Sequence, residues 1–210
     1  PVLPAGSPDF RILHISDMHM IPGQWKKTEF MHSLAALEPD LVMNTGDNLS
    51  HVGGMEPLLE ALDPLMDFPG VFVPGSNCYF APIFKNPARY LWQPRTPQTI
   101  EEGSRVALPI EQMHEAFESR GWTGLVNRYD TLKLNGLRLE FSGVDDPHLR
   151  YDKHPGFAPG AFDESTEPSV RIGVAHAPYM RTLHRFVQDG AQAIFAGHTH
   201  GGQVCLPGGR

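Results

Sequence analysis

Two histidines close to the end of the chain, His198 and His200, lie two positions apart within the sequence Gly-His-Thr-His-Gly-Gly. They follow an apolar run of strand length. Because alternate residues of an extended segment point to the same side, both imidazole rings are expected to face one site. A mixed set of carboxylate, amide and imidazole ligands suits Mn, Fe, Zn or Co. Such side chains also follow four other apolar runs, as Asp17 with His19, Asp47, Asn77 and His176.

Each of these side chains has an ordinary explanation when it is considered alone. A single histidine after a strand is more often a surface or hydrogen-bonded residue than a ligand. Asp and Asn in the same place often cap a helix or form a turn. The presence of ligand types after all five apolar runs favours one shared metal site over five separate coincidences.

The elements that would position these residues alternate between strands and helices. Because the strands read as near-continuous apolar runs, this order predicts an α/β fold with a sheet buried on both faces. Ligands of such sheets bind beyond the carboxyl ends of the strands, so residues from Asp17 to His200 would meet in one crevice. Strands are predicted at 10–16, from Asp40, from Gly70, from Val170 and at 191–197, and helices at 24–37, from Met55, at 110–120 and at 178–190.

Three features interrupt this alternation. Pro57 and Pro64 are expected to interrupt the helix that begins at Met55. Residues 129–144 alternate apolar and polar side chains around Asn135 and Gly136, which predicts an antiparallel hairpin. Residues 77–109 are rich in Pro, Asn and aromatic side chains without a clear period, which predicts a functional lid or a partly mobile loop. Its aromatic side chains would either form an apolar wall for a lipid or nucleoside group or pack against the domain itself.

Composition limits the classes of protein to which the chain can belong. Its 210 residues are enough for one well-buried core, so we expect a single domain over 1–210. The formal charge of −7 argues against broad electrostatic binding to nucleic acid or anionic membrane. No apolar run reaches the roughly 18 residues that span a bilayer, and Cys78 and Cys205 are too few for a disulfide scaffold. The first ten residues lack the basic and apolar regions of a signal peptide, although a chain whose N-terminus has been processed would look the same. We expect a cytoplasmic or membrane-associated protein.

Five short motifs carry a resemblance to a known family. They are Asp17-Met18-His19, Gly46-Asp47-Asn48, Gly75-Ser76-Asn77, Ala175-His176-Ala177-Pro178 and Gly197-His198-Thr199-His200. In order and spacing they resemble the calcineurin-like metallophosphoesterases, and the strings GDN, PGSN, GVDDPH and GHTHGGQ resemble the YkuE-like bacterial branch of that family. The resemblance implies an α/β fold of the four-layer α/β/β/α sandwich type, with a dinuclear metal site at the strand ends.

The same resemblance assigns the ligands to two divalent metal ions, each of them Mn, Fe, Zn or Co. It implies that Asp47 bridges both ions. Two such ions would clamp the attacking and leaving oxygens of an in-line displacement at phosphorus. The nucleophile would be a hydroxide that bridges the ions, so no protein nucleophile is expected. The other ligands of one ion would be Asp17, His19 and His200, and those of the second ion would be Asn77, His176 and His198.

One position departs from the family pattern. Members commonly have a histidine near the phosphate directly after the metal-binding asparagine, whereas Cys78 follows Asn77 here. A neutral thiol is a poor proton donor, which places help to the leaving group from this position in doubt. Cys78 is kept as a candidate catalytic residue, with a small space-filling residue, a weak ligand and a redox-sensitive position as the alternatives. His148, in the motif GVDDPH, is the second candidate catalytic residue, with a solvated turn residue as the alternative. Asn48 and Tyr79, beside the metal motifs, are candidate substrate-binding residues.

These predictions favour a phosphohydrolase that cleaves a phosphoester or pyrophosphate bond. The expected substrate is a phosphorylated small molecule or a lipid-linked phosphate. Any membrane association is expected to involve residues outside positions 1–210. The sequence leaves the oligomeric state open. The alternative is a metal-binding regulatory protein of the same fold with little or no turnover, which Cys78 favours. A nuclease is disfavoured by the acidic charge. The family pattern also predicts further strands after Arg210, without which the sheet that carries His198 would have an open edge.

Overall fold

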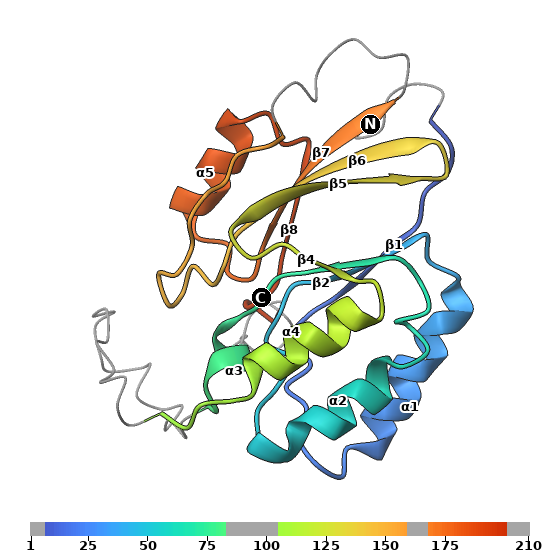
Figure 1. Ribbon diagram of the computed structural model, residues 1–210, viewed down its shortest axis with the longest axis vertical. Helices are drawn as coiled ribbons and strands as arrows, with labels where there is room; N and C mark the ends of the chain where they lie inside the picture. Colours follow the sequence, from blue (N-terminus) through green and yellow to red (C-terminus); the bar gives the residue numbers. More distant parts are fainter. Residues whose placement is uncertain (1–6, 83–104, 159–167, 201–210) are drawn as a thin grey trace, which may run out of the picture.

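The computed structural model describes residues 7–82, 105–158 and 168–200 of the chain. Two four-stranded sheets pack face to face, and helices cover their outer faces, which gives the predicted α/β/β/α layers (Figure 1). The first half contains β1 Ile12–Ile15, α1 Trp25–Ser33, β2 Leu41–Asn44, α2 Met55–Leu62, β3 Gly70–Phe72, α3 Ser76–Tyr79, α4 Ile110–Ser119 and β4 Thr123–Gly124. The second half contains β5 Arg128–Leu134, β6 Leu137–Gly143, β7 Ser169–Ala175, α5 Met180–Gln188 and β8 Ala193–Ala196.

The first sheet is parallel throughout and has the strand order β1-β2-β3-β4. Alternate side chains of β2 point to opposite faces: Leu41 and Met43 pack between the two sheets, and Val42 packs toward the helices. On the helix side, Phe72 of β3 meets Phe117 of α4 with ring centroids 5.2 Å apart. The helices α1, α2 and α4 cover this face (Figure 1), so β2 and β3 are buried on both faces as predicted.

The second sheet combines antiparallel and parallel pairing in the order β5-β6-β7-β8. The strands β5 and β6 form the predicted hairpin, and the two turn residues Asn135 and Gly136 have φ values of 50° and 76°. Both values are typical of the tight turns that match the twist of a hairpin. The remaining pairs are parallel, and on the outer face Phe186 of α5 packs directly on Gly173 of β7, where a side chain would collide with the ring.

The structure changes the interpretation of the two prolines in the third predicted helical stretch. Pro57 lies in the first turn of α2, where a missing backbone N–H removes no helical hydrogen bond, so it does not interrupt the helix. Helix α2 ends at Leu62, two residues before Pro64. The prediction that Pro57 breaks the helix is therefore wrong.

Two short elements were not anticipated from the sequence. The strand β4 has only two residues, too few for a periodic signal, and pairs with β3 at the sheet edge. The helix α3 begins at Ser76 and continues to Tyr79, so it includes the first residues of the segment that was expected to be a loop. Residues 83–104 of that segment lie outside the described residues, as does any strand after Arg210. They include four of the side chains considered for the apolar wall, Phe84, Tyr90, Leu91 and Trp92.

A membrane-spanning helix is not found among the described residues, because none of their helices has both the length and the apolar character that a bilayer requires.

Candidate metal centre

All seven predicted metal ligands lie together at the carboxyl ends of β1, β2, β3, β7 and β8. Their donor atoms form two groups. The outer half-site consists of Asp17, His19 and His200. The inner half-site consists of Asp47, His176 and His198, with Asn77 beside it. Within each three-residue group, one donor atom of every residue lies within 4.8 Å of the others. The grouping of the six Asp and His residues agrees with the two ligand sets that the resemblance implied. The side-chain amide of Asn77 instead lies 3.2 Å from Nδ1 of His19 in the outer half-site. The assignment of Asn77 to the inner ion and the binding of ions by either group stay predictions.

The outer half-site gathers one carboxylate oxygen and two imidazole nitrogens. The Oδ1 atom of Asp17 lies 3.1 Å from Nε2 of His200 and 3.9 Å from Nε2 of His19. The two Nε2 atoms are 3.3 Å apart, and their rings are stacked with centroids 5.3 Å apart. Three donors that face one another at these distances surround a space suited to one cation.

The inner half-site has the same composition but is more deeply buried. The Oδ2 atom of Asp47 lies 3.3 Å from Nε2 of His176, which in turn is 3.2 Å from Nδ1 of His198. The same Oδ2 atom is 4.0 Å from Nε2 of His19 in the outer half-site. A single oxygen of Asp47 therefore lies between the imidazoles of both groups, which is the placement that a bridging ligand requires.

Each carboxylate uses one oxygen for support and presents the other to the site. The Oδ2 atom of Asp17 accepts hydrogen bonds from the backbone N–H of His198 at 2.9 Å and from Ser16 Oγ at 2.5 Å. The Oδ1 atom of Asp47 accepts from the backbone N–H of Asn77 at 2.7 Å. The Oδ1 atom of Asp17 is buried without a hydrogen-bond partner. A buried carboxylate oxygen with no donor, facing two imidazole nitrogens, fits a cation, because such an atom is costly to leave unpaired.

Backbone and hydroxyl groups set the orientation of two of the imidazole rings. Nδ1 of His176 lies 2.8 Å from the carbonyl oxygen of Thr45. A carbonyl can only accept, so Nδ1 carries the proton and leaves Nε2 free as a ligand. Nδ1 of His19 lies 3.0 Å from Ser50 Oγ and 3.2 Å from the side-chain amide of Asn77, and these two contacts hold its ring in place. Thr45 and Ser50 were missed in the sequence, which offers no signal for them.

Five of the predicted ligands have a positive φ, a backbone conformation that residues other than glycine rarely adopt. Positive φ in a residue with a side chain costs about 1–3 kcal/mol and is concentrated at functional sites, where the surrounding structure enforces it. The structure thus stores strain at the residues that the motifs single out. The φ values are 55° at Asp17, 47° at His19, 53° at Asp47, 71° at His198 and 50° at His200.

A glycine allows the two halves of the inner half-site to approach each other. A Cβ atom on Gly75 would overlap Oδ1 of Asp47 and would lie 2.6 Å from the ring of His176. Since real Cβ atoms do not approach so closely, the motif Gly75-Ser76-Asn77 needs glycine for its first residue.

Burial and neighbouring charges prepare the inner half-site for a cation. Burial lowers the pKa of His198 to about 4, and the nearby His176 adds to this shift, so the ring is neutral at pH 7. Burial alone would raise the pKa of Asp47, but the hydrogen bond and charge of His176 hold it below its usual value. For His176 burial acts to lower the pKa, and the contact with Asp47 raises it overall. The ionised carboxylate of Asp47 and the neutral ring of His198 are in the protonation states that metal binding requires, whereas the raised pKa of His176 lets protons compete with an ion for its ring.

Cys78 and Asn48 lie in the core and have no exposed surface. Burial raises the pKa of the Cys78 thiol to about 12, and its sulfur accepts the backbone N–H of Asn48 at 3.5 Å. The side-chain amide of Asn48 donates to the sulfur of Met113. Complete burial fits the space-filling interpretation of Cys78, and the predicted catalytic role of Cys78 and binding role of Asn48 stay predictions.

His148 is placed at the mouth of the inner half-site. Its exposed ring lies 5.1 Å from the ring of His198, centroid to centroid, and its Nδ1 atom is 3.0 Å from the hydroxyl of Tyr179. Tyr79 is half-buried and donates its hydroxyl proton to Oδ1 of Asp145 at 2.7 Å. Burial and this carboxylate both raise the pKa of Tyr79. Tyr179 was missed in the sequence, although it stands directly after the motif that contains His176.

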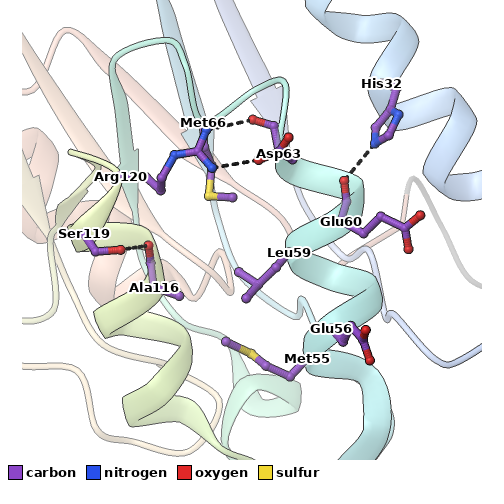
Figure 2. A pocket seen from close by; sticks show the side chains of 10 residues that line it. All are labelled: His32, Met55, Glu56, Leu59, Glu60, Asp63, Met66, Ala116, Ser119 and Arg120. Atoms are coloured by element: carbon purple, nitrogen blue, oxygen red, sulfur yellow. Dashed lines mark hydrogen bonds and ion pairs between the residues drawn. The ribbon is translucent and has the colours of Figure 1, made fainter.

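A groove of about 730 Å³ lies away from these residues, between α2 and α4. Figure 2 shows its apolar floor, with Met55 and Leu59 of α2 facing α4, and its charged rim, where Arg120 is paired with Asp63. None of the residues that line it is a predicted site residue. The groove is therefore separate from the candidate metal centre.

Comparison with known proteins agrees with the geometry of the site. The sequence profile of the calcineurin-like phosphoesterase family matches residues 10–202, a range that contains both half-sites. A relative, the uncharacterized protein YpbG of Bacillus subtilis (strain 168), is 26% identical over 203 residues. The match covers 95% of the present chain and 64% of the relative, so the chain spans less than two thirds of that protein's length.

Proposed function

The chain belongs to the calcineurin-like phosphoesterase family, and from this premise we propose that it hydrolyses a phosphoester or pyrophosphate bond with the help of two divalent metal ions. The observation that carries the proposal is the pair of half-sites joined by Asp47. Two sets of oxygen and nitrogen donors with one carboxylate between them support a site for two ions. Family membership supports a metal-dependent phosphoesterase, whereas the two-ion centre is part of the proposal.

The residues of both half-sites fit the ions that the family implies. Asp17, His19 and His200 would hold the outer ion, and Asn77, His176 and His198 the inner ion, with Asp47 shared between them. When bound, the pair supplies an activated water at neutral pH and positive charge beside the leaving oxygen. The mixed oxygen and nitrogen ligands favour Mn, Fe, Zn or Co.

The chain's own residues orient and support this chemistry. Thr45 and Ser50 fix the rings of His176 and His19, which saves the cost of ordering them during the reaction. In the overall reaction a P–O bond to the leaving group breaks and a bond from phosphorus to the oxygen of water forms. The leaving oxygen keeps the electron pair and gains a proton. His148, at the mouth of the inner half-site, is the residue we assign to the leaving-group side.

We further propose a phosphorylated small molecule or a lipid-linked phosphate as the substrate, and membership of the YkuE-like branch. The strings GDN, PGSN, GVDDPH and GHTHGGQ support the branch. The acidic charge of −7 supports a small substrate over a nucleic acid. The expectation of a cytoplasmic or membrane-associated protein stays a prediction.

The test combines metal analysis with a hydrolysis assay. The purified protein should contain close to two equivalents of Mn, Fe, Zn or Co, and should hydrolyse an aryl phosphate monoester or diester when Mn(II) is added. Asp47→Ala should abolish the turnover. A suitable control is Asp63→Ala, which removes an exposed carboxylate that is paired only at the surface, with Arg120.

A second function, metal binding for regulation without turnover, is favoured by one observation. The position after Asn77 holds a buried cysteine in place of an imidazole near the phosphate. Stoichiometric metal without hydrolysis of any monoester, diester or pyrophosphate would support this second function and overturn the first.

A further inference from the structure

The turn that carries His148 is held against the start of α5 by a series of hydrogen bonds. The backbone of the turn is fixed first. Asp146 is fully buried, and its two carboxylate oxygens accept the N–H groups of His148 at 2.9 Å and Leu149 at 3.1 Å. These bonds set the point at which the histidine leaves the core.

Arg181, in the first turn of α5, joins both ends of the same turn. Its Nη2 atom donates to the carbonyl oxygen of Pro147 at 2.9 Å and to Oδ1 of Asp152 at 2.6 Å. The second oxygen of Asp152 accepts from Thr182 Oγ1 at 3.1 Å, and the Asp152 side chain is only 7% exposed. A nearly buried carboxylate beside the first turn of a helix is also favoured by the helix dipole.

Tyr179 fixes the imidazole ring itself. Its hydroxyl lies 3.0 Å from Nδ1 of His148, and the guanidinium carbon of Arg181 lies 5.0 Å from the centre of the tyrosine ring. The arginine therefore supports the turn and the tyrosine at the same time. An exposed histidine would ordinarily sample several rotamers, whereas this one is held through its backbone and its ring beside His198.

We propose that Tyr179 and Arg181 are positioning residues that hold His148 on the leaving-group side of the inner half-site with its ring proton on Nε2. This inference rests on the proposed function. When the tyrosine O–H donates to Nδ1, the neutral ring must carry its proton on Nε2. That N–H donates a hydrogen bond to the leaving oxygen as the P–O bond breaks. The oxygen keeps the electron pair of the bond and takes its proton from solvent water.

Two substitutions and two matched controls separate this role from a general structural one. Tyr179→Phe removes only the hydroxyl, and Arg181→Met removes the guanidinium but keeps most of the side-chain volume. Tyr129→Phe is the control for the first, because the two tyrosines are 40% and 43% exposed. Arg120→Met is the control for the second, because this arginine also pairs with two acceptors, Asp63 and Asp67, away from the site.

The kinetic readout is the dependence on the leaving group. Both variants should lower kcat for phenyl phosphate about tenfold and kcat for 2,4-dinitrophenyl phosphate about twofold or less, because the better leaving group needs little help. His148→Ala should show the same selectivity with a larger loss, on the order of a hundredfold. Bound metal and melting temperature should match the controls. An equal loss on both substrates, or no loss on either, would overturn the inference.

A spectroscopic readout keeps the inference separate from the proposed function. In zinc-loaded protein, the side-chain ¹⁵N resonances of His148 should indicate a proton on Nε2, and Tyr179→Phe and Arg181→Met should shift them while both controls leave them in place. If the wild type hydrolyses no phosphoester, the proposed function fails, and the ring resonances still decide whether Tyr179 and Arg181 hold His148. Unchanged resonances in both variants would contradict the positioning role.

Discussion

The two half-sites use similar ligands but differ in how the protein holds them. In the inner half-site Asp47 is 3% exposed and His176 is fully buried, with its ring fixed by the Thr45 carbonyl. In the outer half-site the His200 side chain is 40% exposed and that of His19 is 25% exposed. The donors of the inner half-site are therefore in place before an ion arrives, whereas those of the outer half-site retain contact with water.

This difference teaches how a dinuclear centre is divided between the core and the surface. Burial prepares the inner donors, since it keeps His198 neutral and strengthens the interactions of Asp47. Exposure leaves the outer donors accessible to solvent and to incoming ligands. We therefore expect the inner ion to be bound more tightly and the outer ion to exchange more readily with ions in solution. The following substitutions test that expectation.

The largest effect should come from the residue that the half-sites share. Asp47→Ala should remove the one ligand that both groups share, and the amount of bound metal should fall to well below one equivalent per chain. Asp17→Ala should affect the outer group alone and leave close to one equivalent. Activity should fall at least about a thousandfold in both variants, because the ions act as a unit. Metal analysis after gel filtration distinguishes the two cases, and equal metal loss in both variants would argue against Asp47 as the bridge.

Burial of Asp146, in the turn beside the inner half-site, should also make the stability of the metal-free protein depend on pH. Burial raises the pKa of Asp146 from 3.8 to about 6. An acid with a higher pKa in the folded state holds its proton while the unfolded chain has already lost it. The stability that this proton gives to the folded state is therefore fully present below about pH 4. It is lost as the pH rises to about 6 and stays lost at higher pH. At 1.36 kcal/mol per pKa unit the loss is about 3 kcal/mol at most.

The measurement is urea unfolding with a chelator present, between pH 4 and pH 7.5. Asp146→Asn should lack this part of the pH dependence, although the loss of a hydrogen bond to Leu149 lowers its stability by a constant amount. The control Asp130→Asn changes a carboxylate on β5 instead. If the stability of the wild type and of Asp146→Asn depends on pH with the same slope, the Asp146 carboxyl group titrates normally and the turn around it is better solvated than its burial indicates.

The sequence predicts this asymmetry only in part, and the reasons are physical. The apolar runs predict the strands, and chain order places polar residues such as Asp47 and His176 at the strand ends. The split of the ligands into two sets follows from the family resemblance. Contacts made by side chains from distant segments, such as His176 with Thr45 or His148 with Tyr179, depend on tertiary packing and leave no periodic signal.

The backbone at the ligands was also beyond sequence reasoning. Positive φ is usually signalled by Gly or Asn, and His19 and His200 are neither. Here the surrounding structure imposes the conformation against local preference. The burial of Cys78 was left open for a related reason, since the loop from Asn77 gives no period from which an inward side can be read.

A chelator series should show whether the two ions differ in affinity. The inner donors are more deeply buried than the outer ones, and the ring of His176 is fixed by a backbone carbonyl. Because such support commonly changes metal affinity by about 10–100-fold, the inner ion should resist chelator concentrations about that much higher. Wild-type zinc protein should lose metal in two steps. His200→Ala should lack the weak step and keep the tight one, whereas His198→Ala should lose the tight step. Zinc released per chain is the measurement, and a single step that removes both ions together would contradict the asymmetry.

The smallest effect tests what the half-sites have in common. With a chelator present, His19→Gly should be more stable than His19→Ala by about 1 kcal/mol, because only glycine adopts positive φ without strain. Asp47→Gly should be more stable than Asp47→Ala by a similar amount, although position 19 is half-exposed and position 47 is buried. At His184, an exposed position within α5, the order should reverse by about 1 kcal/mol, since glycine destabilises a helix. If the glycine variant is more stable than the alanine variant by the same amount at positions 19 and 47, backbone strain is present in both half-sites. The difference in burial then remains the main difference between them. A gain at position 47 alone would mean that the exposed half relaxes when no ion holds it, which would extend the asymmetry from the side chains to the backbone.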